Sequence, residues 1–346
     1  APVASAASAL NWAAAAALLL AAALAGRRRE GRRWIAGGLA ASALFQVLYG
    51  AEGLAARRST IWGVEAGGAA ERLRGTYVNP DHLALLLGMT LPVLLAWGWW
   101  AARRAREEVA LERRYLLVAP PAIAWLTVFV GLAFTGSRGG LIAAAVAATV
   151  QAALLALRGR RMRLWVAGVA VLAIGLATVA AIGLQQGLGR WLATSRYELT
   201  WNDRIGMARH TLELWGRFPL FGVGLGAYRE AAPLVLPAEL ARSGWLRHAH
   251  NDLVELPATT GVIGLAAMLA GVGWLGAGFV RRFRGAARSE DRCAALAALG
   301  ALAAVAVHSA FDFGMTMPAN AVAFAVLCGA ALGVWPNQPP RGDDRG

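Results

Sequence analysis

The sequence predicts an all-α membrane protein that crosses the bilayer many times. Of its 346 residues, 58% are hydrophobic and only 16% are charged, and the mean hydropathy is +0.50. A soluble domain of this size carries about a quarter charged residues. Apolar runs of about 20 residues recur along the chain, which is the length a helix needs to cross the hydrocarbon core. The short alternating segments of a β-barrel are not seen in the sequence.

Nine apolar runs are long enough to be membrane helices, and we expect about nine transmembrane helices in this chain. They cover residues 2–25, 34–56, 82–102, 115–134, 141–157, 164–184, 257–280, 293–310 and 318–335. One long hydrophilic segment, 185–256, separates the sixth run from the seventh, and residues 336–346 form a short tail. We therefore interpret residues 1–346 as a single integral membrane domain with one large loop.

The arginines indicate which side of the membrane each loop occupies. All 34 basic residues are arginines. The alternate loops 27–33, 103–114, 158–163 and 281–292 hold five, five, four and five of them, 19 in about 37 residues. Cytoplasmic loops carry such an excess, so this side and the tail are cytoplasmic, and the loop 185–256 is extracytoplasmic. The net charge of +14 thus reflects topology, and we expect no nucleic-acid partner.

This topology places the first residue outside the cell. A chain without a signal peptide rarely starts there, and position 1 is Ala rather than Met. We therefore expect that one or more amino-terminal helices are missing from this sequence.

Arg138 stands in the tight turn 135–140 between the fourth and fifth runs, on the side where arginine is scarce. One interpretation is an interfacial arginine whose stem lies along the apolar surface while its head reaches water. The other is a functional group, because an ionisable residue held at the edge of the membrane is a candidate by default.

Within the long loop, residues 201–215 predict an amphipathic helix on the outer face. Apolar residues recur at helical spacing, and Asn202 or Asp203 can cap its start. The apolar residues are Ile205, Ala208, Leu212 and Trp215. The glycines of the following segment, 218–226, lack the strand–helix context of a dinucleotide fingerprint, so we reject that alternative.

The densest group of titratable residues lies where the loop meets the membrane again. His248 and His250 stand beside Asn251, Asp252 and Glu255, directly before the seventh run. Histidine titrates near a pKa of about 6.5 and can take a proton from a hydroxyl at neutral pH. His250 is therefore a candidate base, and a solvated loop histidine is the alternative.

A second pair, His308 and Asp312, lies at the outer end of the eighth run. On a helix, a spacing of four residues would place both on one face. Asp312 could orient a histidine or offset the charge of an arginine. The alternative is that the two residues are only a polar pair at the end of a helix.

We expect neither a metal nor another cofactor. His248 and His250 have no third ligand at suitable spacing, and the outer loop has no Asp-x-Asp pattern. The two cysteines, Cys293 and Cys328, lie in apolar runs and are interpreted as packing residues.

Four stretches resemble, in order, the motifs of the O-antigen ligase/polymerase superfamily of bacterial membrane glycosyltransferases. The resemblance extends over about residues 70–330. The stretches are Gly-Thr-Tyr-Val-Asn-Pro-Asp-His-Leu-Ala at 75–84, Thr-Gly-Ser-Arg-Gly-Gly at 135–140, Arg204 with Pro-Leu-Phe-Gly-Val-Gly at 219–224, and His-Ala-His-Asn at 248–251 with Gly261 and Gly264. The first departs from the family in one place, since Asp81 stands where the family has Asn.

The resemblance implies a GT-C-like helical fold and metal-independent, inverting transfer of a glycan from an undecaprenyl-pyrophosphate carrier. The site would face the outside of the inner membrane, and the acceptor would be a lipid-anchored molecule, as in lipopolysaccharide, a glycan or a protein. Besides donor and acceptor, membrane lipids are the expected partners. By resemblance, the pyrophosphate is bound by Arg138 and Arg204, the base is His250, and the supporting residues are His248, Asn251 and Asp312.

Two other functions remain open. A lipid-linked polysaccharide polymerase of the same superfamily would share these motifs. A membrane transporter would place charged or broken-helix sites near mid-membrane and often show inverted repeats, whereas the candidate residues here gather at the outer edge.

Overall fold

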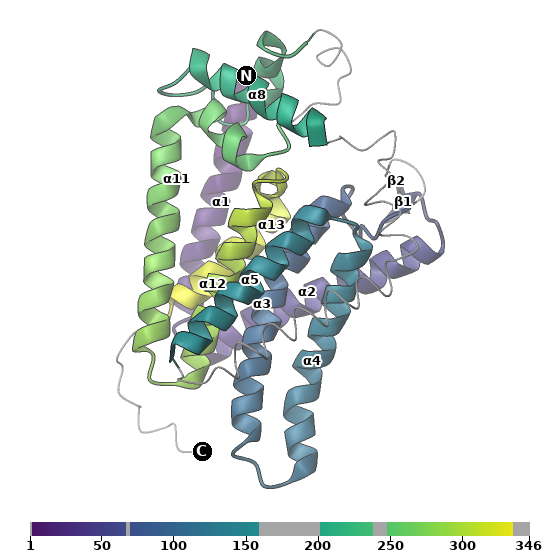
Figure 1. The fold of residues 1–346 in the computed structure, drawn as a ribbon, viewed down its shortest axis with the longest axis vertical. Helices are drawn as coiled ribbons and strands as arrows, with labels where there is room; N and C mark the ends of the chain where they lie inside the picture. Colours follow the sequence, from purple (N-terminus) through teal and green to yellow (C-terminus); the bar gives the residue numbers. More distant parts are fainter. Residues whose placement is uncertain (1, 67–69, 159–200, 238–247, 335–346) are drawn as a thin grey trace.

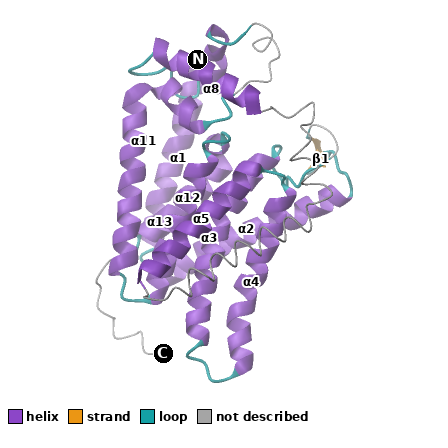
Figure 2. Ribbon diagram, viewed as in Figure 1, coloured by secondary structure: helices purple, strands orange, loops and turns teal. Residues whose placement is uncertain are grey.

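The structure is a computed structural model and describes residues 2–66, 70–158, 201–237 and 248–334. These residues form a mostly helical bundle with one small hairpin (Figure 2). The long helices are α1 (Pro2–Ala25), α2 (Arg29–Ala55), α3 (Pro80–Ala105), α4 (Leu111–Phe134), α5 (Arg138–Arg158), α8 (Trp201–Arg217), α11 (Asp252–Gly285), α12 (Ser289–His308) and α13 (Pro318–Leu332). The short elements are β1 (Thr60–Ile61), β2 (Val64–Glu65), α9 (Tyr228–Ala231), η1 (Ala232–Leu234) and η2 (Gly314–Thr316).

Within these described residues, seven helices are long and apolar enough to cross a membrane, and α13 is a shorter apolar helix. They correspond to eight of the nine predicted runs, and the run 164–184 lies outside the described residues. The all-α membrane class is thereby confirmed. Several helices start three to five residues before their runs, because hydropathy omits the polar first turn that follows a helix cap. For example, α11 begins at Asp252 rather than at residue 257.

The centre of the bundle is α3, which packs against α4, α5 and α12 (Figure 1). Its apolar residues are buried almost around the whole helix, as in Leu83, Leu87 and Met89. The facing helix α12 is rich in alanine and allows a close approach: a Cβ on Gly300 would lie 2.6 Å from Cβ of Pro92 in α3. Small residues at such contacts are typical of helix pairs in membranes, where packing rather than hydrophobic exclusion drives association.

The two ends of the bundle differ in character. At the start of α12, Glu290 and Asp291 form ion pairs with Arg33 and Arg32 of the first arginine cluster. The arginine-rich turns after α3 and before α12 are both toward the lower part of the bundle in Figure 1. The starts of α3, α5 and α11 and the end of α12 lie at the opposite end, about 30 Å away for a helix of 20 residues. The candidate polar residues are at this second end.

The segment after α8 is joined to a break in α11. Four backbone hydrogen bonds connect them: Val223 N–H to the Ala258 carbonyl (3.0 Å), Gly224 N–H to the Thr259 carbonyl (2.9 Å), Val262 N–H to the Pro219 carbonyl (2.8 Å) and Ile263 N–H to the Leu220 carbonyl (3.4 Å). They replace hydrogen bonds that α11 loses where Gly261 leaves the helical conformation. The third and fourth motifs are therefore in contact, although about 40 residues separate them.

Two glycines make this contact possible. Gly261 has φ 66° and ψ −169°, a conformation open almost only to glycine. A Cβ on Gly261 would lie 2.1 Å from the Leu220 carbonyl oxygen, and one on Gly222 would lie 2.3 Å from the Thr259 carbonyl carbon. A backbone atom cannot yield as a side chain can, so both positions exclude any larger residue.

Gly261→Ala is expected to destabilise the folded protein, because backbone strain of about 1–3 kcal/mol adds to the overlap with Leu220. Gly271→Ala, in the same helix with no atom within 4 Å of the added Cβ, is the matched control. We expect the apparent Tm in detergent, measured by size exclusion after heating, to fall by at least several degrees for the first variant only. Equal Tm values for both variants would contradict this account of the break.

The helix predicted at 201–215 is present as α8. Its buried face consists of Met207, Thr211 and Leu214, which pack toward the loop and α11. The predicted apolar residues Ile205 and Leu212 are on the other side and stay exposed. The position of α8 is thus set by a face that includes a threonine, whose hydroxyl lies 2.8 Å from that of Tyr228.

Candidate active site

The site is organised around the turn that follows α12. The helix ends at His308, and the N–H groups of Phe311 and Asp312 both donate to the His308 carbonyl (2.8 and 3.1 Å). The helix thus ends before Asp312, and the charge of Asp312 acts on the buried ring of His308. Asp252 at the start of α11 closes the turn, since its N–H donates to the Ser309 carbonyl (2.9 Å).

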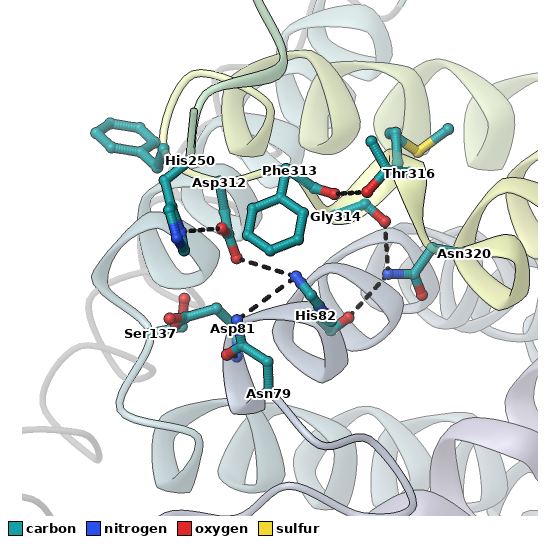
Figure 3. Close-up of polar contacts among 12 residues, drawn as sticks. Asn79, Asp81, His82, Ser137, His250, Asp312, Phe313, Gly314, Thr316 and Asn320 are labelled. Atoms are coloured by element: carbon teal, nitrogen blue, oxygen red, sulfur yellow. Dashed lines mark hydrogen bonds and ion pairs between the residues drawn. The ribbon is translucent and has the colours of Figure 1, made fainter. Parts of the chain in front are cut away.

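Asp312 lies between two imidazoles (Figure 3). Its Oδ1 is 3.2 Å from Nδ1 of His250, and its Oδ2 is 3.7 Å from Nε2 of His82. The Asp312 side chain is only 3% exposed, so its charge is compensated by these rings rather than by water. The contact with His250 is the geometry that the predicted orientation of a histidine requires, and the role of Asp312 stays a prediction.

His250 has an unusual backbone. Its φ is 51°, in the left-handed region that few residues other than glycine adopt. The strain is held by Asp312 on the side chain and by the start of α11 directly after it. Within the described part of the chain, no hydrogen bond engages Nε2, the second ring nitrogen of His250. Such an outlier at a polar site is typical of a functional residue.

The first turn of α3 supplies His82. Asn79 caps this helix by accepting a hydrogen bond from Asp81 N–H (2.9 Å), and Pro80 takes the first helical position, where no N–H is needed. The Arg72 guanidinium donates a hydrogen bond from Nη2 to Oδ1 of Asp81 (2.8 Å). The motif 75–84 thus builds a helix start that aims His82 at Asp312.

Four of the five histidines of the chain meet at this end of the bundle. His82, His248 and His250 all contact the ring of Phe313, with centroid distances of 4.6, 4.2 and 4.7 Å. The fourth, His308, is 1% exposed, and neither ring nitrogen has a partner among the described residues. Phe313 is the apolar core of a cluster built from α3, the 248–251 segment and the end of α12.

The residues next to His250 have structural tasks. Asn251 caps α11, because its side chain accepts a hydrogen bond from Leu253 N–H (3.0 Å). His248 contacts Glu255 through Nδ1 (2.8 Å), and Glu255 also accepts from Ala249 N–H (2.7 Å). Both contacts fix the short segment that carries His250.

The two candidate arginines approach the same turn from different helices. Arg204 of α8 donates to the Phe311 carbonyl. Arg138 begins α5 and is exposed, and its neighbour Gly139 lies so close to Phe311 that an added Cβ would be 2.7 Å from the Phe311 Cβ. Phe311 precedes Asp312, so segments around residues 138, 204 and 250 come together at one turn.

The local backbone favours anions at this end. Ser137 caps α5, since its hydroxyl accepts from Gly140 N–H (3.2 Å), and Gly136 supplies the turn at φ 66°. The amino-terminal ends of α3, α5 and α11 are all at this end of the bundle. Each such end carries a partial positive charge and free N–H groups, which suit phosphate.

Two pKa shifts describe the electrostatics outside the helices. Burial by itself raises the pKa of Asp312, but the hydrogen bond from His250 and the nearby His82 and His308 outweigh it and lower that pKa to about 2. Asp312 is therefore a carboxylate at every physiological pH. Burial raises the pKa of Tyr77 to about 12, so its hydroxyl stays a neutral donor to the Asn320 side-chain oxygen (2.9 Å).

Sequence reasoning missed His82 and Phe313. His82 belongs to the first motif. The only signal in the sequence that it could be a site residue was its place among polar residues at the very start of an apolar run. Phe313 gives no signal in the sequence, because its role is to pack three rings from distant segments. In the described residues, no three His, Cys, Asp or Glu side chains are arranged to hold a metal ion.

A bundle of membrane-length helices with histidine–carboxylate pairs and arginines at one end defines a multi-pass membrane protein with a buried polar site. Residues 122–269 match the family of O-antigen ligases, and this match supports the resemblance to the O-antigen ligase/polymerase superfamily. The match includes Arg138, Arg204 and His250 but neither the 75–84 motif nor Asp312. No curated protein matches the chain. The family implies a glycosyltransferase-like ligase or polymerase of the inner membrane that acts on lipid-linked glycans.

Proposed function

We propose that the protein transfers a glycan from an undecaprenyl-pyrophosphate carrier to an acceptor hydroxyl, in the manner of an O-antigen ligase. The observation that carries the proposal is the convergence at the turn 308–313: Arg204 binds the Phe311 carbonyl, Gly139 beside Arg138 packs on Phe311, and His250 binds Asp312. These three segments supply the groups that the transfer needs, two cations for a diphosphate and a base.

The diphosphate of the donor binds to Arg138 and Arg204 in this proposal. Guanidinium groups form planar forks that match phosphate oxygens, and they stay charged at every relevant pH. The amino-terminal ends of α3 and α5 add backbone donors at the same place. Because the arginines offset the charge of the diphosphate, we propose that transfer needs no metal ion.

His250 acts as the base. Asp312 accepts from Nδ1–H of His250, so that Nε2 carries the free lone pair. As the acceptor oxygen attacks C1 of the sugar, its proton passes to Nε2, and the bond from C1 to the diphosphate oxygen breaks. The diphosphate leaves with the electron pair and the configuration at C1 is inverted. The charge that develops on the leaving group is stabilised by the arginines.

The site faces the outside of the inner membrane in this proposal. The arginine-rich turns lie at the opposite end of the bundle, and such turns remain in the cytoplasm. A site that takes a glycan from a lipid carrier must be at the edge of the bilayer, and helix ends provide such a position.

Deletion of the gene, followed by its return at full length, tests the function and separates a ligase from a polymerase. Loss of a ligase leaves long glycan chains attached to the carrier, whereas loss of a polymerase leaves single repeat units. We expect the first result, and single units would assign the polymerase activity instead. An unchanged envelope glycan would refute both activities and favour a transporter or a structural role.

Removal of metal ions tests the metal-free mechanism. We expect the purified protein in lipid nanodiscs to transfer glycan at an unchanged rate after treatment with excess EDTA. A loss of activity that Mg²⁺ or Mn²⁺ restores would contradict the assignment of the diphosphate charge to arginines.

A further inference from the structure

His82 occupies a position that the proposed reaction does not yet explain. Its Nε2 lies 3.7 Å from Oδ2 of Asp312, on the side of the carboxylate opposite to His250. Both side chains are buried, at 7% and 3% exposure. Oδ2 has no hydrogen-bond partner among the described residues, so the ring of His82 is the nearest group that can offset it.

Both the backbone and the ring of His82 are held in place. Asn320, which is fully buried, donates to the His82 carbonyl (3.0 Å). The edge of the ring packs on Phe313 at an interplanar angle of 81°. The Asn79 amide nitrogen is 3.5 Å from Nε2, which is a packing contact rather than a hydrogen bond when Nε2 carries the proton that faces Asp312. A histidine fixed in this way cannot turn from Asp312 without disturbing α3 and α13, and its orientation is therefore set by the fold.

We propose that His82 is a positioning residue for the transfer reaction: it holds Oδ2 of Asp312, so that Oδ1 stays on Nδ1 of His250 and Nε2 of His250 stays free to take the proton. This inference rests on the proposed function of His250. A carboxylate that faces a ring on one side only can rotate, whereas rotation is restricted when rings enclose it on both sides. His82 thus acts through Asp312 without touching the substrate.

The arrangement predicts a pH effect with a definite sign. When the imidazole that faces Oδ2 is removed, the charge of the Asp312 carboxylate is less compensated and its field at His250 becomes more negative. This favours the imidazolium form of His250, so the acidic limb of the pH–rate profile moves to higher pH. The other titratable groups that act on Asp312 are His308 of α12 and Asp252 of α11, while Glu255 acts on Asp252 and Arg204 donates to the neighbouring Phe311 carbonyl. Substitution of His82 leaves all of these groups in place.

The first test compares two variants of the full chain in nanodiscs. His82→Leu removes the ring nitrogen that faces Oδ2. His82→Gln keeps a polar N–H group there, because the glutamine amide nitrogen takes about the place of Nε2. We expect His82→Leu to lower kcat about tenfold to a hundredfold with KM for the donor little changed, and to move the acidic limb up by about half a pH unit or more. His82→Gln should restore much of the rate and the original limb. The control is His210→Gln on α8, which lies outside this cluster.

The second test does not depend on glycan transfer. Diethyl pyrocarbonate modifies only unprotonated imidazole, and mass spectrometry reads the fraction of His250 modified at each pH. We expect the midpoint to move to higher pH in His82→Leu and to stay in place in His82→Gln. Identical midpoints in wild type and His82→Leu, with both proteins folded, would overturn the role of His82. If the midpoint shifts in His82→Leu but the wild-type protein transfers no glycan, the role of His82 stands and only the proposed function is overturned.

Discussion

Replacing His250 is expected to abolish glycan transfer while the protein still folds and inserts. A positioned base contributes about a hundredfold to ten-thousandfold to a rate, and no second histidine has the same access to Asp312 and to solvent. His250→Ala removes the base completely. His250→Asn is the sharper variant, because asparagine tolerates φ 51° and its amide nitrogen can still donate to Asp312. Both variants should lose at least a hundredfold in kcat, measured with purified protein and a lipid-linked donor.

The control is His210→Asn on α8, a half-exposed histidine beside Glu213. We expect it to transfer glycan at the wild-type rate. Wild-type glycan ladders from His250→Asn would refute the assignment of the base. A His250→Asn protein with the same Tm as wild type but no activity would show that the loss is chemical rather than structural.

Replacing either arginine is expected to cost about a hundredfold or more in rate, because the leaving diphosphate would lose one of two cations. Arg204→Ala is the first variant to make. Arg204→Lys should recover only part of the loss, since lysine keeps the charge but not the fork that binds two phosphate oxygens. We expect Arg138→Ala to show a loss of similar size, which would exclude a merely interfacial arginine. The measurement is kcat and KM for the lipid-linked donor.

Arg209→Ala is the matched control, because Arg209 is an exposed arginine on the same helix as Arg204. Its rate should equal that of the wild type. Arg204 also donates to the Phe311 carbonyl, so Tm must be measured beside activity to separate binding from support of the turn. Full activity of Arg204→Ala or Arg138→Ala would remove that residue from the diphosphate site.

Much of the fold could be predicted because hydropathy and charge are local properties of the sequence. An apolar run of membrane length must be a helix in lipid, whatever its neighbours are. The turn 135–140 was likewise within reach, since turn residues act over three or four positions. The predicted positions of the helix ends were less accurate, because the first turn of a helix is polar and hydropathy does not detect it.

The glycines of the third and fourth motifs show where local reasoning stops. The sequence marks 219–224 as a turn and Gly261 as part of a motif, but it does not say that the two are in contact. Their requirement for glycine arises from a backbone-to-backbone crossing at Leu220 and Thr259. Such a contact depends on how α8 and α11 pack, and no pattern along the chain encodes the distance.

The sequence by itself determined the membrane class, the separation of an arginine-rich side from a polar side, and the candidates Arg138, Arg204, His250 and Asp312. Only the tertiary structure decided that Asp312 is shared by two imidazoles whose residues are 168 positions apart, and that three histidines pack on one phenylalanine. The physical reason is one of range. Hydropathy, caps and turns act over a few residues, whereas a hydrogen bond between a loop and the end of α12 exists only after the helices between them have packed.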